Sequence, residues 1–144
     1  MEKKILISAC LYGDKCRYNG SDVKNDLKFE DKEVLKICPE LLGGLSIPRE
    51  SCEIVEGTAE DVINGTAKII GISGKDYTNE YIEGMEKAVE LVKKHKIEIA
   101  YLKQNSPSCG YGKVYDGNFC GKIIEGNGIF AERLKKLGIK IIGI

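Results

Sequence analysis

The chain has 144 residues, the size of one ordinary globular domain. Its hydrophobic fraction of 42% is that of a protein that buries a core, and its 22 basic residues balance its 22 acidic residues. Zero net charge gives no support to a general nucleic-acid or membrane-surface role, and no apolar run approaches the roughly 18 residues of a membrane span. The first residues lead directly into an apolar run without a signal-peptide pattern. We therefore expect one domain over residues 1–144, located in the cytoplasm.

The cysteine content indicates which kinds of chemistry the protein can perform. Six cysteines in a cytoplasmic chain favour metal, cluster or redox chemistry over a disulfide framework. CxxC pairs are absent, which argues against a zinc ribbon and against a thioredoxin-like motif. The position of each cysteine relative to the predicted elements is therefore the informative feature.

Apolar runs and helical periodicity predict the elements in chain order. The predicted strands are 3–9, 53–57, 66–71, 97–102 and 139–144, and the predicted helices are 27–36, 77–95 and 129–137. Asn64-Gly65 predicts a hairpin turn between the second and third strands, in a peripheral excursion of the chain. A Gly-rich loop is predicted over 111–121. The alternation of strands and helices predicts an α/β fold, a single Rossmann-like domain with a mostly parallel sheet flanked by helices.

Three cysteines follow the ends of predicted elements. Cys10 follows the first apolar run, and Cys38 follows the segment 33–37. Cys109 lies on the turn 106–110, directly after the strand 97–102, where Pro107 prevents the strand from continuing. Ligands of open α/β sheets bind beyond the carboxyl ends of the strands. The hypothesis is that the three thiols converge on one site.

Three thiolates fit two metal sites. A zinc ion held by three cysteines would keep water as its fourth ligand. A [4Fe–4S] cluster held by three cysteines would keep one iron without a protein ligand. The spacing does not choose between them, nor does it exclude three unrelated structural thiols. Cys16, Cys52 and Cys120 are interpreted as loop or small buried residues.

Polar residues near these cysteines are candidates for catalysis and binding. Glu40 can serve as a general acid beside Cys38, or it can be a first-turn glutamate of a helix that begins at Pro39. Ser106 and Ser108 flank the Cys109 turn. A phosphate group on the substrate would need a cationic site. The candidates for that site are Arg17, Arg49 and Lys103.

Five short motifs occur in one order along nearly the whole chain. They are Ser8-Ala9-Cys10-Leu11, Arg17-Tyr18-Asn19-Gly20, the run from Cys38 to Leu45 with Ile47-Pro48-Arg49, Ser106-Pro107-Ser108-Cys109-Gly110, and Tyr115-Asp116-Gly117-Asn118-Phe119. Together they resemble the thiouracil desulfidase family. Asn19 stands where the family pattern has Asp, and Cys52 and Cys120 stand where it has Ala and Ser.

The resemblance implies a function and a set of site residues. It implies that a [4Fe–4S] cluster with one iron not bound by protein is held by Cys10, Cys38 and Cys109. It implies the non-redox removal of sulfur from a thiolated uracil compound whose sulfur binds the open iron, giving a uracil-type product and sulfide. Glu40 and either Ser106 or Ser108 would be catalytic. The alternatives are a zinc-dependent hydrolase that uses the same cysteines and a non-catalytic iron–sulfur binding or sensor module.

Overall fold

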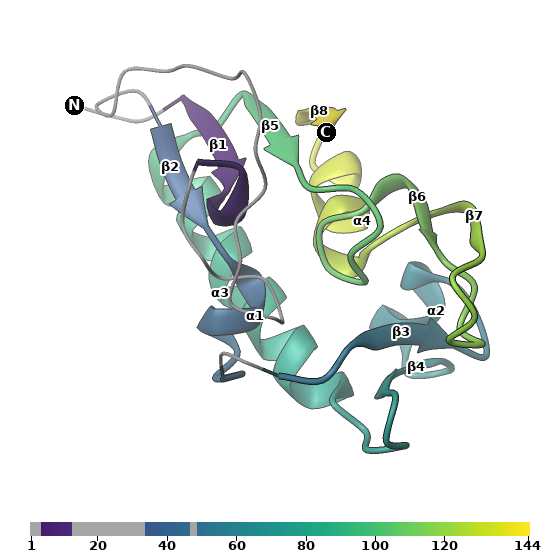
Figure 1. The fold of residues 1–144 in the computed structure, drawn as a ribbon. Coiled ribbons are helices and arrows are strands. Elements are labelled where there is room, and N and C mark those ends of the chain that lie inside the picture. The colour runs from purple at the N-terminus through teal and green to yellow at the C-terminus, as the bar shows by residue number, and fades with distance from the viewer. Residues whose placement is uncertain (1–3, 13–33, 47–48) are drawn as a thin grey trace.

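The computed structural model describes residues 4–12, 34–46 and 49–144. Its centre is a four-stranded parallel sheet in the order β2-β1-β5-β8 (Figure 1). The strands are β1 (Ile5–Ser8), β2 (Val34–Ile37), β5 (Ile99–Leu102) and β8 (Lys140–Gly143). From β1 the chain adds β2 on one side and β5 on the other. The carboxyl ends of these strands therefore border a topological switch point, where α/β sheets bind ligands.

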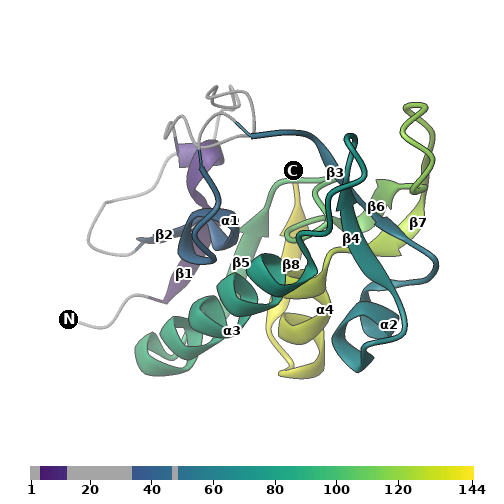
Figure 2. The ribbon, with the colours of Figure 1, turned by 90° about the horizontal axis from the view of Figure 1, so that it is seen from below.

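Two helices cover one face of this sheet. They are α3 (Thr78–His95) and α4 (Ile129–Lys136), which lie side by side in Figure 2. The buried side chains of α3 recur at helical spacing, and they join Leu6, Ala100 and Phe130 in the main core. Alternate strand residues such as Ile7 and Val34 form a smaller cluster on the opposite face. The predicted α/β fold with a parallel sheet is therefore confirmed.

A short helix fixes the end of β2. The helix α1 (Pro39–Leu42) begins one residue after Cys38 and packs against α3. The contact depends on two glycines, because a Cβ on Gly84 would overlap with the Pro39 carbonyl and a Cβ on Gly43 would overlap with the Glu80 carbonyl. The expected helix start at Pro39 is confirmed.

Two antiparallel ribbons extend the fold beyond the sheet (Figure 1). The first pairs β3 (Cys52–Val55) with β4 (Lys68–Gly71), and the second pairs β6 (Tyr111–Tyr115) with β7 (Ile123–Asn127). The helix α2 (Ala59–Asn64) connects β3 to β4 along the chain and packs against α4. No helix that the structure describes has the length and hydropathy needed to cross a membrane.

Three predicted elements differ from the structure. Residues 34–36 of the predicted helix 27–36 belong to β2, because Val34 and Ile37 are buried where this strand pairs with β1; residues 27–33 lie outside the described residues. Asn64-Gly65 is not a hairpin turn, since Gly65 ends α2 in the left-handed conformation with φ of 87°. The predicted loop 111–121 begins with strand β6, whose partner β7 lies further along the chain.

Candidate functional site

A cavity of about 330 Å³ lies at the carboxyl ends of β1, β2 and β5. Cys10, Cys38 and Cys109 all line it, and none of them forms a disulfide. Cys10 lies in η1 (Ala9–Tyr12), the 3₁₀ turn that follows β1 directly, and Cys38 precedes α1. The structure thus brings the three predicted thiols to one cavity because their strands are neighbours in the sheet.

The Cys109 turn is held by backbone and hydroxyl hydrogen bonds. Ser106 Oγ accepts from the backbone N–H groups of Ser108 (3.0 Å) and Cys109 (3.1 Å). The carbonyls of Pro107 and Ser108 accept from the first N–H groups of α4 at 2.8 and 2.9 Å, which satisfies donors that a helix start leaves unpaired. A Cβ on Gly128 would overlap with the Ser108 carbonyl, so α4 fits closely under the turn.

The Glu40 side chain accepts three hydrogen bonds within the site. Its Oε2 accepts from Arg49 at 3.1 Å and from the Cys38 thiol at 3.4 Å, and its Oε1 accepts from Ser106 Oγ at 3.1 Å. The side chains of Arg49 and Glu40 are 7% and 12% exposed. The carboxylate is therefore oriented at both oxygens, beside Cys38, one of the three thiols predicted to converge.

Burial raises the pKa of the Cys109 thiol well above its usual range. The negative charges of Glu40 and Cys38 raise it further, whereas hydrogen bonds from the hydroxyls of Ser8 and Ser108 lower it. The Ser108 side chain is fully buried, and its Oγ has no partner of good geometry among the described residues. Two hydroxyls thus lie beside a thiol that would need stabilisation as a thiolate.

A second wall of the cavity comes from the two ribbons. We call Cys10, Cys38, Glu40, Ser106 and Cys109 the sheet wall, and Cys52, Glu53, Ile72, Tyr115 and Phe119 the hairpin wall. Burial is the main reason that the pKa of Cys52 is raised, to about 11. Cys52 was interpreted as a structural thiol, and the segment around it as peripheral, yet both line the cavity.

The remaining predicted site residues lie as follows. Arg49 and Lys103 line the cavity, and Lys103 donates its backbone N–H to Ser8 Oγ at 3.0 Å and its Nζ to the Gln104 carbonyl at 3.0 Å. Ser106 lines the cavity, whereas Ser108 is buried within the turn. Arg17 lies outside the described residues. The sequence does not indicate Glu53 as a site residue, and Phe119 occurs only as the last residue of the fifth motif.

Comparisons with known proteins place the chain in a family. The model of the family described as 2-thiouracil desulfurase matches residues 5–143. The chain belongs to the 2-thiouracil desulfurase family. It is 48% identical over 141 residues to the uncharacterized protein YbbK of Bacillus subtilis (strain 168), an alignment that covers 96% of this chain and 93% of that protein.

A solved member of this group has the same fold. The structure of the [4Fe-4S]-dependent thiouracil desulfidase TudS superposes with a TM-score of 0.83 at 33% identity, over 99% of this chain and 91% of that one. The resemblance to the thiouracil desulfidase family that the five motifs indicate is therefore confirmed.

The cavity contains the type of donor that an iron–sulfur cluster uses. No three His, Cys, Asp or Glu side chains in residues 4–12, 34–46 and 49–144 have the geometry to hold one metal ion. Cysteines that bind different irons of a cluster are spaced farther apart than cysteines around one zinc. Cys10, Cys38 and Cys109, which line one cavity, supply the soft thiolate donors of such a cluster.

Proposed function

We propose that this protein removes sulfur from thiolated uracil compounds, giving a uracil-type product and sulfide. The observation that carries the proposal is a single cavity where three cysteine-bearing strand ends meet the Glu40–Ser106 pair. Membership of the 2-thiouracil desulfurase family supports the same reaction. A [4Fe–4S] cluster held by Cys10, Cys38 and Cys109 would supply, when bound, a Lewis-acidic iron without a protein ligand for the soft thiocarbonyl sulfur.

Glu40 is the proposed acid–base residue. Its carboxylate takes a proton from a water molecule as the water oxygen attacks the thiocarbonyl carbon, and it returns the proton to the departing sulfur. The thiolated ring and water become the oxo ring and hydrogen sulfide, so the reaction needs no electron donor. Arg49 holds Oε2 and keeps the carboxylate in one orientation.

Ser106 is better suited to positioning than to nucleophilic attack. Its hydroxyl donates to Glu40 Oε1 and also accepts two backbone N–H groups, which occupy its oxygen lone pairs. A nucleophilic serine needs a free lone pair directed at the substrate. Ser106 therefore orients Glu40 relative to the Cys109 turn, and Ser108 stabilises the Cys109 thiolate from within the turn.

Both cationic candidates among the described residues already have hydrogen-bond partners. Arg49 is committed to Glu40, which leaves it a structural rather than a phosphate-binding role. Lys103 lines the cavity and is the better candidate among the described residues for an anionic group on a nucleotide substrate.

The test begins with anaerobic reconstitution with iron and sulfide. We expect about four irons per chain and turnover of 2-thiouracil to uracil and sulfide. Glu40→Gln should keep the iron content and lose roughly 100-fold or more in kcat, the contribution of general acid–base catalysis. Cys109→Ala should lose both iron and activity, and Cys120→Ala, which removes an exposed thiol outside the cavity lining, should lose neither.

Two results would contradict the proposal. One is a protein that binds about one zinc and no iron. The other is a Cys109→Ala variant with full cluster content and full activity.

A further inference from the structure

The hairpin wall contains a buried carboxylate that the proposed reaction does not use. Glu53 in β3 is 5% exposed and lines the cavity. The three hydrogen-bond partners of Glu40 do not include it. Charged side chains are rarely buried without a partner. The two carboxylate oxygens of Glu53 have different surroundings.

One oxygen of Glu53 holds a loop. Its Oε1 accepts from the backbone N–H groups of Gly117 (2.9 Å) and Phe119 (3.3 Å), in the loop between β6 and β7. Gly117 has φ of 91°, and a Cβ there would lie 2.5 Å from the Ile54 carbonyl. Phe119 has φ of 55°, a left-handed conformation that is uncommon for a bulky residue.

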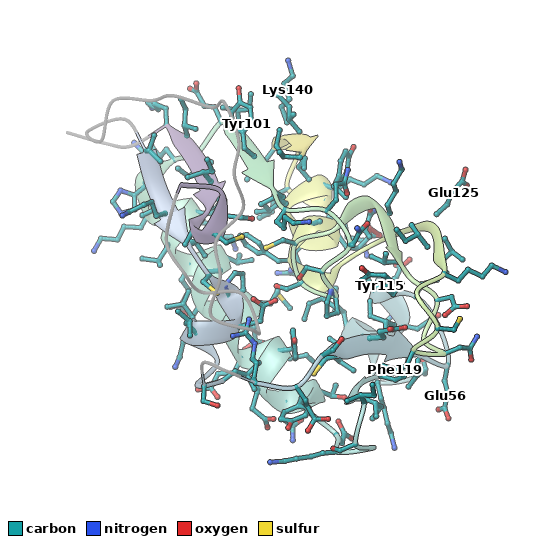
Figure 3. All side chains as sticks on the ribbon, viewed as in Figure 1. Glu56, Tyr101, Tyr115, Phe119, Glu125 and Lys140 are labelled. Carbon is teal, nitrogen blue, oxygen red and sulfur yellow. The ribbon has the colours of Figure 1, made fainter. Side chains whose placement is uncertain are left out.

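This anchoring brings an aromatic ring to the cavity. Phe119 lines the cavity, as does Tyr115 at the end of β6, and Figure 3 shows Phe119 beside β3. Backbone strain at a residue that lines a site points to a functional reason for its position. Aromatic rings are suitable partners for the faces of a planar pyrimidine.

The second oxygen of Glu53 is directed at the cavity. No described residue donates to Oε2, and Oε2 is not among the polar atoms that are shut off from solvent without a partner. Because Glu53 is almost wholly buried and lines the cavity, the space that remains open to Oε2 is the cavity itself. A carboxylate oxygen accepts hydrogen bonds and cannot donate them, so it selects a donor.

We propose that Glu53 is a specificity-determining residue whose Oε2 accepts a hydrogen bond from a ring N–H of the thiolated pyrimidine, while its Oε1 fixes the loop that presents Phe119 to the ring. The inference rests on the proposed function and names what the hairpin wall recognises: an unsubstituted N–H of a neutral thiolactam ring. Such an N–H lies next to the thiocarbonyl carbon, so the hydrogen bond also orients that carbon toward the sheet wall.

The variant Glu53→Gln distinguishes the recognition of the ring N–H from the anchoring of the β6–β7 loop. The glutamine oxygen still accepts the two loop N–H groups, which leaves its NH₂ facing the cavity, where it cannot accept a ring N–H. We expect KM for 2-thiouracil to rise roughly 10- to 100-fold with a smaller change in kcat, as for the loss of a hydrogen bond to a charged group. The iron content and the thermal unfolding midpoint should stay near those of wild type.

Methylated substrates identify the hydrogen bond. For one of the two methylated compounds, 1-methyl- or 3-methyl-2-thiouracil, wild type should have a kcat/KM at least about tenfold lower than for 2-thiouracil. Glu53→Gln should remove most of that difference in kcat/KM. A steric exclusion of the methyl group would persist in the variant. Loss of the loop alone would lower kcat/KM for all three compounds equally.

The matched control is Glu56→Gln, one residue beyond β3, whose exposed side chain is not part of the cavity lining and points outward in Figure 3. It should behave as wild type. An active wild type with unchanged KM and unchanged methyl discrimination in Glu53→Gln would overturn this inference alone. A reconstituted wild type that desulfurises none of the three compounds would overturn the proposed function and this inference together.

Discussion

Glu40 and Arg49 form an ion pair in which both side chains are largely buried, unlike the exposed pairs such as Lys87–Glu83. An exposed pair contributes little to stability. A buried pair is different, because removal of one partner leaves an uncompensated charge in a site of low dielectric. The orientation of the proposed acid–base residue therefore depends on a neighbour nine residues away in sequence.

The first prediction concerns this pair. Arg49→Met should lower the free energy of unfolding by about 3 kcal/mol, since Glu40 is left buried without its cation. The double variant Glu40→Gln/Arg49→Met should be destabilised less than Arg49→Met alone, because no charge remains to be buried. Urea unfolding of the metal-free, reduced proteins measures both. Additive losses would show that the two side chains do not interact.

At the scale of single residues, the sequence predicts the site residues of the sheet wall but none of the hairpin wall. Cys10, Cys38, Glu40, Ser106 and Cys109 follow apolar runs, which mark them as residues beyond the ends of predicted elements. Glu53 carries no such mark, because its burial results from a loop more than 60 residues further along the chain. A glutamate in a short predicted strand is usually expected to be exposed. Here the loop that contains Gly117 covers it.

Among the elements, the contact between α1 and α3 has the most direct effect on the site. Gly43 and Gly84 allow two helix backbones to approach so closely that neither position accepts a Cβ without overlap. Cys38 and Glu40 lie at the start of α1, so their positions follow from this packing.

Gly84→Ala tests the contact. In an ordinary helix interior this change stabilises by about 1 kcal/mol. Here we expect destabilisation by roughly 1–3 kcal/mol, because the methyl group must displace α1 or α3. Glu83→Ala, at the exposed neighbouring position of α3, is the control. Chemical unfolding and iron content after reconstitution are the measurements, and a stabilised Gly84→Ala with full iron content would contradict the packing argument.

The elements that periodicity predicted are the long or continuously apolar ones. The helices α3 and α4 and the strands β1, β5 and β8 agree with expectation to within one or two residues at most boundaries. Residues 34–36 are predicted as the end of the helix 27–36 because charged residues near the two ends of that segment resemble those of helix termini. Four residues are too few for periodicity to decide, and only pairing with β1 makes them a strand.

For the whole molecule, the three proposed ligands connect segments that are distant in the chain. Cys10, Cys38 and Cys109 follow three adjacent strands, and Cys109 is also tied to α4 through its turn. A cluster bound at all three would link these strand ends in the folded state only. Binding to the folded state alone raises stability by mass action.

Removal of the cluster should therefore lower the unfolding temperature. We expect the reconstituted protein to unfold at least about 5 °C above the metal-free protein, the change that corresponds to one or two kcal/mol in a domain of this size. Cys109→Ala, treated identically, should show no increase. Equal unfolding temperatures for wild type with and without about four bound irons would mean that the cluster does not bridge the three strands.

The two walls of the cavity are encoded by different stretches of the chain, and this separation affects how the protein can change over generations. On the proposed function, substitutions in the β3–β4 and β6–β7 ribbons change the hairpin wall and leave Cys10, Cys38 and Cys109 in place. A lineage can then alter which ring the cavity accepts without losing these three thiols. The sheet wall offers no such freedom, because each of its thiols is attached to a strand of the central sheet.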